Sequence, residues 1–371
     1  MSRKIQNRVP SMDLLRCTAL FFVIAVHFFL HTGYYEWPVD GLRMYIMTLL
    51  RSYLMICVPL FIVLSGYLTC KKTISLGYYR KIIYTIGIYV LASACCYAYK
   101  VLFSNDVFSL SVFIKGLMSF SSAPYAWYVE MYLGLFLLTP LLNSLYNGLK
   151  SQREKQVLLG TMILLTAMPL VVNIYIDDLE WFADPASSQD YVKILPTYWT
   201  GLYPVTYYFI GCYLREFKLK LTARSNLLLS VLVFFINGTF NYYRSHGACF
   251  IKGPWQEYGS FLIMVQTVLV FSFFDALQEH HFPKWAARIL PKMAGSCFGA
   301  YLLSWIFDVT IYKFLTERVS PMPLRIGYLP LTTLLVFICS MVLSWMIHQV
   351  YAAAEKLLTV IRRKDRCDHR L

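Results

Sequence analysis

The chain alternates between long apolar runs and short polar connections along its whole length. Most runs are close to 20 residues, which is enough for an α-helix to cross a hydrocarbon core of about 30 Å. The pattern predicts an all-α integral membrane protein with about ten transmembrane helices. The runs lie near residues 14–33, 45–69, 82–103, 126–147, 157–176, 197–214, 226–243, 259–277, 295–314 and 329–350.

Composition agrees with this class. The chain has 371 residues, of which 58% are hydrophobic and 15% charged, whereas soluble domains carry charge at about a quarter of their positions. The first run begins near Leu14 without the cleavage site of a signal peptide, so we interpret it as a retained signal-anchor helix. The cysteines form no Cys-x-x-Cys pair and lie mostly in apolar runs, so we expect neither a metal site nor a disulfide framework.

Basic residues indicate the orientation of the helices. Most of the 34 lysines and arginines lie at the termini and in alternate connections, and such residues stay in the cytoplasm. We therefore predict that both termini are cytoplasmic, with a transmembrane domain at 1–350 and a basic cytoplasmic tail at 351–371. The same rule explains the net charge of +14, so we expect membrane lipids and no nucleic acid as partners. The acid-rich segment 176–191 is an extracytoplasmic lid, a sugar-facing loop or a solvated loop without a role.

Two ionisable residues in the first run point to a function. Arg16 and His27 are eleven positions apart, which places them within about 20° of one another on a helix and roughly 16 Å apart along it. Ionisable groups inside a membrane helix usually face a cavity or a partner. Asp13 shares this side and would hold the Arg16 guanidinium by an ion pair. The alternative for His27 is a hydrogen bond to a backbone carbonyl, with no chemical role.

Other intramembrane ionisable residues are candidate partners for His27. Glu130 lies one turn into the fourth run, at a level comparable with His27, and a carboxylate there would fix the tautomer of the imidazole and raise its basicity. This pairing is a hypothesis, because a single sequence does not show which helices touch. Asp308 and Lys313 are close enough in sequence to pair with each other, which gives them a structural explanation.

Four further segments, in this order after the Arg16 and His27 helix, match a known pattern. They are VPLFIVLSGYL (58–68), WYVEMYLGLFLLTPLL (127–142), YYFIGCYL (207–214) and SCFGAYLLSW (296–305). The chain resembles the membrane-bound acyltransferase 3 family, which O-acylates sugars of bacterial envelope glycans and some other acceptors. It departs from the family pattern at Tyr84, where a second basic residue often stands, and at Ser304, where histidine is common. The second departure indicates a subgroup with its own acceptor.

The resemblance implies a cytosolic acyl-CoA donor, most simply acetyl-CoA, with no permanently bound cofactor. Arg16, Arg80 and Lys81 would bind the phosphates of coenzyme A at the inner interface. His27 would act as general base on an acceptor hydroxyl, or as a nucleophile in an acyl-histidine relay, with Glu130 as its partner.

Five residues are predicted at the substrate or tunnel. They are Asp13, which shares a side of the helix with Arg16, and Ser65, Tyr67, Trp127 and Tyr128, which lie in the segments that carry the resemblance. Ser65 is equally explained by close helix packing. The acceptor would be a glycan or a lipid-linked sugar outside the membrane, and the protein would lie in the bacterial inner membrane as a multi-pass protein. The acyl group, the acceptor and the oligomeric state stay open.

A proton-coupled transporter or flippase is the alternative function, with His27 and Glu130 as a proton relay. Buried charges suit either class. Transporters usually repeat their architecture in two halves, and we find no repeat between residues 1–185 and 186–371. The sequence therefore favours the acyltransferase.

Overall fold

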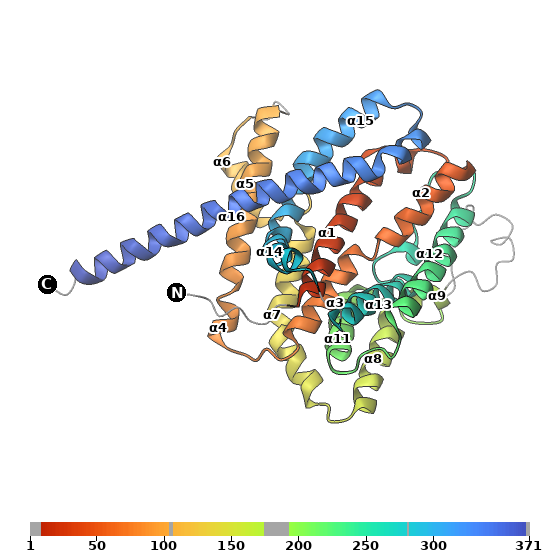
Figure 1. The fold of residues 1–371 in the computed structure, drawn as a ribbon, viewed down its shortest axis with the longest axis horizontal. Helices are drawn as coiled ribbons and strands as arrows, with labels where there is room; N and C mark the ends of the chain where they lie inside the picture. The colour runs from red at the N-terminus through yellow and green to blue at the C-terminus, as the bar shows by residue number, and fades with distance from the viewer. Residues whose placement is uncertain (1–8, 104–106, 174–192, 280–281, 369–371) are drawn as a thin grey trace.

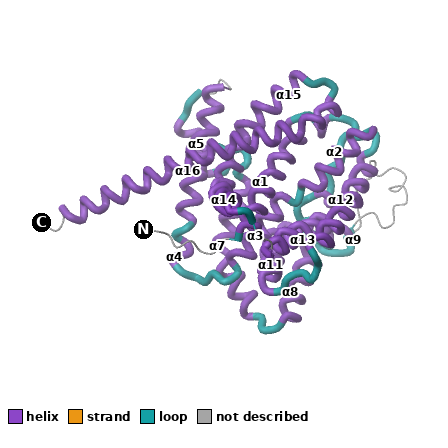
Figure 2. The backbone as a smooth tube through the Cα atoms, viewed as in Figure 1, coloured by secondary structure: helices purple, strands orange, loops and turns teal. Residues whose placement is uncertain are grey.

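Helices make up all the regular structure in the part of the chain that the computed structural model describes, which is residues 9–103, 107–173, 193–279 and 282–368. The all-α class is confirmed for these residues, and Figure 2 shows how short most of the connections between the helices are. The acid-rich segment 176–191 lies outside the described residues.

Each predicted apolar run overlaps at least one helix. In chain order the helices are α1 (Pro10–His31), η1 (Tyr34–Glu36), α2 (Gly41–Leu54), α3 (Cys57–Thr69), α4 (Leu76–Tyr79), α5 (Ile82–Phe103), α6 (Leu110–Met118), α7 (Trp127–Gly148), α8 (Gln152–Thr166), α9 (Pro169–Val172), η2 (Thr200–Leu202), α11 (Tyr203–Glu216), α12 (Ala223–Ser245), η3 (Pro254–Gln256), α13 (Phe261–Ala276), η4 (Leu277–Glu279), α14 (Lys284–Phe307), η5 (Asp308–Tyr312), α15 (Lys313–Arg318), η6 (Met322–Tyr328) and α16 (Leu329–Asp368).

Seven helical stretches of the described chain are long and apolar enough to cross a membrane. The multi-pass membrane class is thus supported, whereas the count of about ten spans and the cytoplasmic termini stay predictions. The seven stretches are Pro10–His31, Gly41–Thr69, Leu76–Phe103, Trp127–Gly148, Ala223–Ser245, Lys284–Arg318 and Met322–Leu357.

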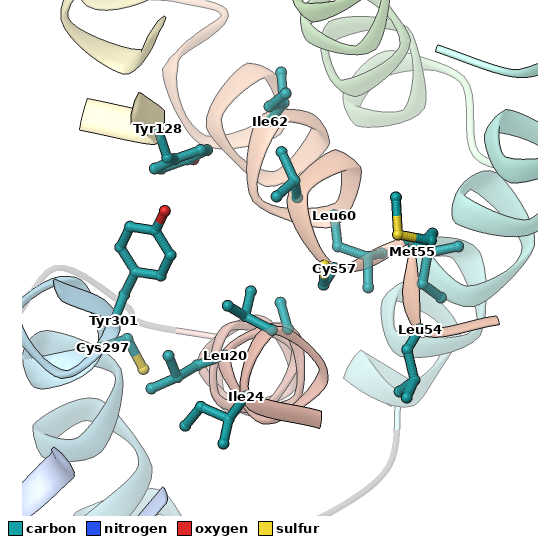
Figure 3. Packing of buried hydrophobic residues seen from close by; sticks show 14 of the residues in the cluster. Leu20, Ile24, Leu54, Met55, Cys57, Leu60, Ile62, Tyr128, Cys297 and Tyr301 are labelled. Atoms are coloured by element: carbon teal, nitrogen blue, oxygen red, sulfur yellow. The ribbon is translucent and has the colours of Figure 1, made fainter. Parts of the chain in front are cut away.

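Helix α1 lies at the centre of the bundle (Figure 1) and packs against α3, α14 and α16. Its side chains Leu20, Ile24 and Phe28 are fully buried. Figure 3 shows Leu20 and Ile24 between the ribbons of α3 and α14. Because lipid tails are as apolar as leucine, van der Waals packing of this kind carries helix association in a membrane. The central position gives the α1 residues access to several other helices.

The second span is broken between α2 and α3, at Met55 and Ile56. Pro59, in the first turn of α3, has no N–H to donate to the carbonyl of Met55, and its ring clashes with that carbonyl in a continuous helix. The proline therefore accounts for a break inside the apolar run.

Helix α16 continues past the predicted end of the last span. The boundary at residue 350 falls inside this one helix, which runs from Leu329 to Asp368. Figure 1 shows its last turns extending well beyond the rest of the bundle. The predicted basic tail 351–371 is therefore largely an extension of the last membrane helix.

Candidate active site

A cavity of about 1090 Å³ opens between α1, α3, α5, α7, α14 and α16. This volume is at the upper end of the range for ligand sites in proteins, roughly 300–1,000 Å³. The cavity brings together five of the residues that the sequence analysis singled out, which come from four separate segments of the chain. They are Arg16, Ser65, Arg80, Lys81 and Tyr128.

The cations of the cavity lie on two elements. Arg16 is half-buried on α1, while Arg80 and Lys81 are exposed between α4 and α5. The short helix α4 is held in place by a cap, because the Ser75 hydroxyl accepts a hydrogen bond from the backbone N–H of Tyr78. Tyr78 in turn donates to the carbonyl of Phe136 on α7, at 2.8 Å. These contacts hold the segment that carries Arg80 and Lys81, which line the same cavity as Arg16, as a site for phosphates requires.

Tyrosines line the cavity where it extends along α1. The rings of Tyr128 and Tyr301 are 5.6 Å apart and nearly perpendicular. Figure 3 shows the Tyr301 hydroxyl pointing toward Tyr128, with Cys297 and Leu20 close by. The Tyr301 hydroxyl also donates to the backbone carbonyl of Tyr125, at 2.5 Å. Tyr301 therefore connects the cavity to the segment that precedes α7.

The imidazole of His27 lies next to this tyrosine wall. Val23, one turn earlier on the same face of α1, lines the cavity. The His27 ring lies 3.9 Å from the ring of Tyr125, between centroids. His27 itself does not line the cavity in this structure. The cavity thus extends from Arg16 to the turn of α1 that precedes His27.

The partner of His27 is Asp308. Nδ1 of His27 lies 3.0 Å from Oδ2 of Asp308, and Asp308 is fully buried. If the carboxylate is ionised it can only accept, so Nδ1 is then the donor, and in the neutral imidazole the lone pair of Nε2 is available. An imidazole held by a carboxylate in this way is arranged as a general base.

Two more side chains complete the network around Asp308. The Tyr125 hydroxyl donates to the same Oδ2, at 2.8 Å. Because that hydroxyl has a single proton, its 2.8 Å contact with Nε2 of His31 requires the histidine to be the donor. Two donors therefore converge on one carboxylate oxygen, which stabilises its negative charge inside the bundle.

The hypothesis that Glu130 pairs with His27 is wrong. Glu130 is exposed in the first turn of α7, where the helix dipole favours an acid. It forms neither a hydrogen bond nor an ion pair with His27, because the carboxylate partner of His27 is Asp308. The suggested pair of Asp308 with Lys313 is not formed either, because Lys313 is exposed and Asp308 bonds to His27.

Asp308 begins a five-residue π-helix, η5, at the end of α14. Such segments are rare and are frequently found at functional sites. The sequence carried one signal for this residue, an acid within an apolar run. It carried none for Tyr125, which precedes the α7 motif and is ordinary in a chain with 29 tyrosines.

The remaining predicted residues are spread over the bundle. Tyr67 lies outside the cavity, where its hydroxyl donates to Asp275 on α13 at 2.7 Å. Trp127 stacks on Tyr258 with centroids 5.7 Å apart. Asp13 is buried in the first turn of α1, and its ion pair with Arg16 stays a prediction.

Small residues in two of the motifs serve helix packing. A Cβ atom on Gly66 of α3 would lie 2.1 Å from the carbonyl oxygen of Tyr208 on α11, and one on Gly211 would lie 2.1 Å from that of Val63. Neither position therefore accepts a larger residue without separating the helices. The neighbouring Ser65 lines the cavity, but its hydroxyl donates to the carbonyl of Phe61 within α3, at 2.9 Å.

The structure shows the contacts of Tyr84 and Ser304, the two residues that depart from the family pattern. Tyr84 lines the cavity, with its ring 5.2 Å from that of Tyr351 and 6.0 Å from that of His348. Ser304 is fully buried one turn before Asp308, and its hydroxyl donates to the carbonyl of Tyr301 at 2.9 Å.

Comparison with known proteins identifies the family of the chain. Neither the curated proteins nor the solved structures include a match to the chain. A family model described as an acyltransferase domain matches residues 9–347, which is nearly the whole chain and includes Arg16, His27 and Asp308. The chain therefore belongs to the acyltransferase 3 family of membrane acyltransferases.

Proposed function

We propose that the protein transfers an acyl group, which we take to be acetyl, from cytosolic acyl-CoA to a hydroxyl of a cell-surface or lipid-linked glycan. The observation that carries the proposal is the His27–Asp308 pair, next to a cavity with Arg16, Arg80 and Lys81 at its other end. A cationic entrance and an oriented base are the two parts that transfer from a phosphate-bearing thioester requires.

The donor fits the cavity by its chemistry. Coenzyme A carries several phosphates, which Arg16, Arg80 and Lys81 would bind. Tyr84 is 45% exposed and would supply a face on which the adenine stacks. The thin pantetheine arm would then follow α1 past Val23 toward His27, over a rise of roughly 16 Å.

His27 would start the reaction. Its Nε2 takes the proton of the acceptor hydroxyl while the oxygen attacks the thioester carbonyl. A C–O bond forms, the C–S bond breaks, and the thiolate of coenzyme A leaves with the proton that the imidazole had taken. Asp308 holds the proton on Nδ1 throughout and stabilises the imidazolium that forms. In the alternative relay, the same Nε2 would carry the acyl group between donor and acceptor.

The proposal also assigns the two ends of the site to the two sides of the membrane. The mouth with Arg80 and Lys81 would face the cytoplasm of a bacterial inner membrane, because basic residues concentrate on that side. The acceptor would reach His27 from the opposite side.

The test uses the full chain in phosphatidylcholine nanodiscs. Two quantities are measured, namely acetyl-CoA binding and the slow hydrolysis of acetyl-CoA, which frees coenzyme A. The proteins are wild type, Arg16→Ala, His27→Ala and the control Lys115→Ala, which removes an exposed cation on α6. We expect Arg16→Ala to weaken binding by roughly 10- to 100-fold, since hydrogen bonds to charged groups contribute about 1.5–3 kcal/mol. His27→Ala should bind acetyl-CoA and release no coenzyme A, and Lys115→Ala should match wild type.

Two outcomes would overturn the proposal. One is a wild-type protein that neither binds nor hydrolyses acetyl-CoA or longer acyl-CoAs. The other is a His27→Ala variant that releases coenzyme A at the wild-type rate. An acyl group recovered on His27 after acid quenching would select the relay over the general base.

A further inference from the structure

A second cavity, of about 370 Å³, lies between α2, α9, η2, α11 and the connection from α12 to α13. None of the residues that line it also lines the first cavity. Those that the argument uses are Arg51, Tyr203, Lys252, Gln256, Glu257 and Tyr258.

Arg51 is a buried cation with an unused donor. Its side chain comes from α2 and is 5% exposed. Nε donates to the Tyr35 hydroxyl at 3.0 Å, and the guanidinium lies 4.7 Å from the ring centre of Phe250. Its Nη1 has no hydrogen-bond acceptor among the described residues. Burying a cation without an acceptor costs free energy, and in membrane proteins such a group usually faces the bundle interior or a water-filled cavity and marks a substrate or ion pathway.

The pocket around Arg51 is tied together by contacts between two connections. Backbone bridges pair Pro38 with Cys249 and Val39 with His246. They bring the segment after α1, with Tyr35, against the segment after α12, with Phe250. The ammonium of Lys252 lies 5.2 Å from the Tyr35 ring centre. Arg51 is therefore held from several sides, and a second cation is placed near it.

Gln256 adds an unused acceptor to the same cavity. It is 4% exposed, and its Oε1 has no donor among the described residues. The lining holds two cations, buried Arg51 and exposed Lys252, and one carboxylate, exposed Glu257. A ligand that satisfies the lining must therefore present oxyanion acceptors to Arg51 and a hydroxyl or amide donor to Gln256.

Aromatic rings connect the two cavities. Tyr258 lines the second cavity and stacks on Trp127. Trp127 contacts Tyr128, with centroids 6.1 Å apart, and Tyr128 lines the first cavity. The two cavities thus lie on either side of one group of contacting rings, and Tyr203 offers a further ring beside Tyr258.

We infer that the second cavity is the acceptor site and binds an oxyanion of the acceptor, either the carboxylate of an acidic sugar or a phosphate. Its role as acceptor site rests on the proposed function, whereas oxyanion binding at Arg51 does not. Arg51 and Lys252 hold the oxyanion, Gln256 accepts from a neighbouring hydroxyl, and the tyrosine rings contact the sugar.

The test compares anionic ligands with their neutral counterparts, by calorimetry on the full chain in phosphatidylcholine nanodiscs. Glucuronate is paired with glucose, and glycerol 3-phosphate with glycerol, so that the two arms separate a sugar carboxylate from a phosphate. We expect one anion to bind at least about tenfold more tightly than its counterpart, which corresponds to about 1.4 kcal/mol. Arg51→Gln and Lys252→Gln should each reduce this preference, and the exposed-cation control Lys115→Gln should leave it unchanged.

Acetyl-CoA binding on the same samples separates the two proposals and reports whether Arg51→Gln folds. If acetyl-CoA binds while each anion binds no better than its counterpart, the inference is overturned and the proposed function stands. A preference that persists in Lys252→Gln and in a folded Arg51→Gln would also overturn it, because the oxyanion would then bind elsewhere. If acetyl-CoA does not bind while the Arg51-dependent preference is present, the proposed function fails and oxyanion binding stands.

Discussion

Replacing Asp308 by asparagine tests the central contact of the site. Both His27 and Tyr125 donate to one oxygen of this carboxylate, at 3.0 and 2.8 Å. Asparagine has the same shape and can place its oxygen in that position, but it carries no charge. The substitution therefore removes the charge that stabilises the imidazolium while preserving the packing of η5.

The expected loss follows from that geometry. A hydrogen bond to a charged group contributes about 1.5–3 kcal/mol, and each 1.36 kcal/mol corresponds to about tenfold in rate. With the amide oxygen in place, we expect kcat to fall by roughly 10- to 100-fold. With the amide nitrogen turned toward His27, the proton moves to Nε2 and the loss approaches about 10⁴, as for a wrong imidazole tautomer in a serine protease.

The assay follows free coenzyme A by chromatography, together with acetyl-CoA affinity. Asp308→Asn should lower kcat and leave acetyl-CoA affinity within about twofold, because Asp308 does not line the donor cavity. Asp275→Asn is the matched control, since Asp275 is also a buried acid that accepts from a tyrosine hydroxyl, that of Tyr67. Wild-type kcat in Asp308→Asn would refute the reasoning, as would equal losses of kcat in both variants.

Three further predictions concern packing and donor binding. Gly66→Ala should lower the unfolding temperature, because its Cβ would lie 2.1 Å from a carbonyl oxygen of α11 and overpacking costs about 1–3 kcal/mol. The control Gly134→Ala has open space around the new methyl group and should leave the unfolding temperature unchanged. Tyr84→Leu should weaken acetyl-CoA binding by a factor that corresponds to about 1–3 kcal/mol of base stacking. The binding of acetyl-pantetheine, which has no adenine, should stay unchanged. Equal losses for both ligands would contradict adenine stacking. Replacing Arg80 and Lys81 together by glutamine should weaken acetyl-CoA binding and flatten its dependence on salt, because exposed charges are screened; an unchanged salt dependence would place the phosphates elsewhere.

Several features of the candidate site could be predicted from the sequence because they are local. The alignment of Arg16 and His27 depends on the periodicity of one helix, and Val23, which lines the cavity, lies on the same face. The convergence of Ser65, Arg80 and Tyr128 on one cavity agrees with the family resemblance. The resemblance did not predict the position of Tyr67, which belongs to the same motif as Ser65 but bonds to Asp275 on α13 outside the cavity.

The partner of His27 could not be predicted in this way. Glu130 and Asp308 were both acids in apolar runs, and depth along a helix gave Glu130 the better position. Which of them meets His27 depends on how α14 packs against α1, and that contact joins residues 281 positions apart. The second cavity could not be predicted either, because its lining comes from α2, α9, η2, α11 and the connection from α12 to α13, and no periodic pattern describes the path of that connection.

The amino-acid sequence by itself determined the membrane class, the helices and the face of α1 that carries Arg16 and His27, because hydrophobicity and helical periodicity act over a few turns. The tertiary structure decided that Asp308 orients His27, that Gly66 and Gly211 bring α3 and α11 together, and that Arg51 lines a cavity with a donor that no described residue accepts from. These contacts depend on the packing of helices distant in sequence, since hydrogen bonds and close packing act only between groups a few ångströms apart.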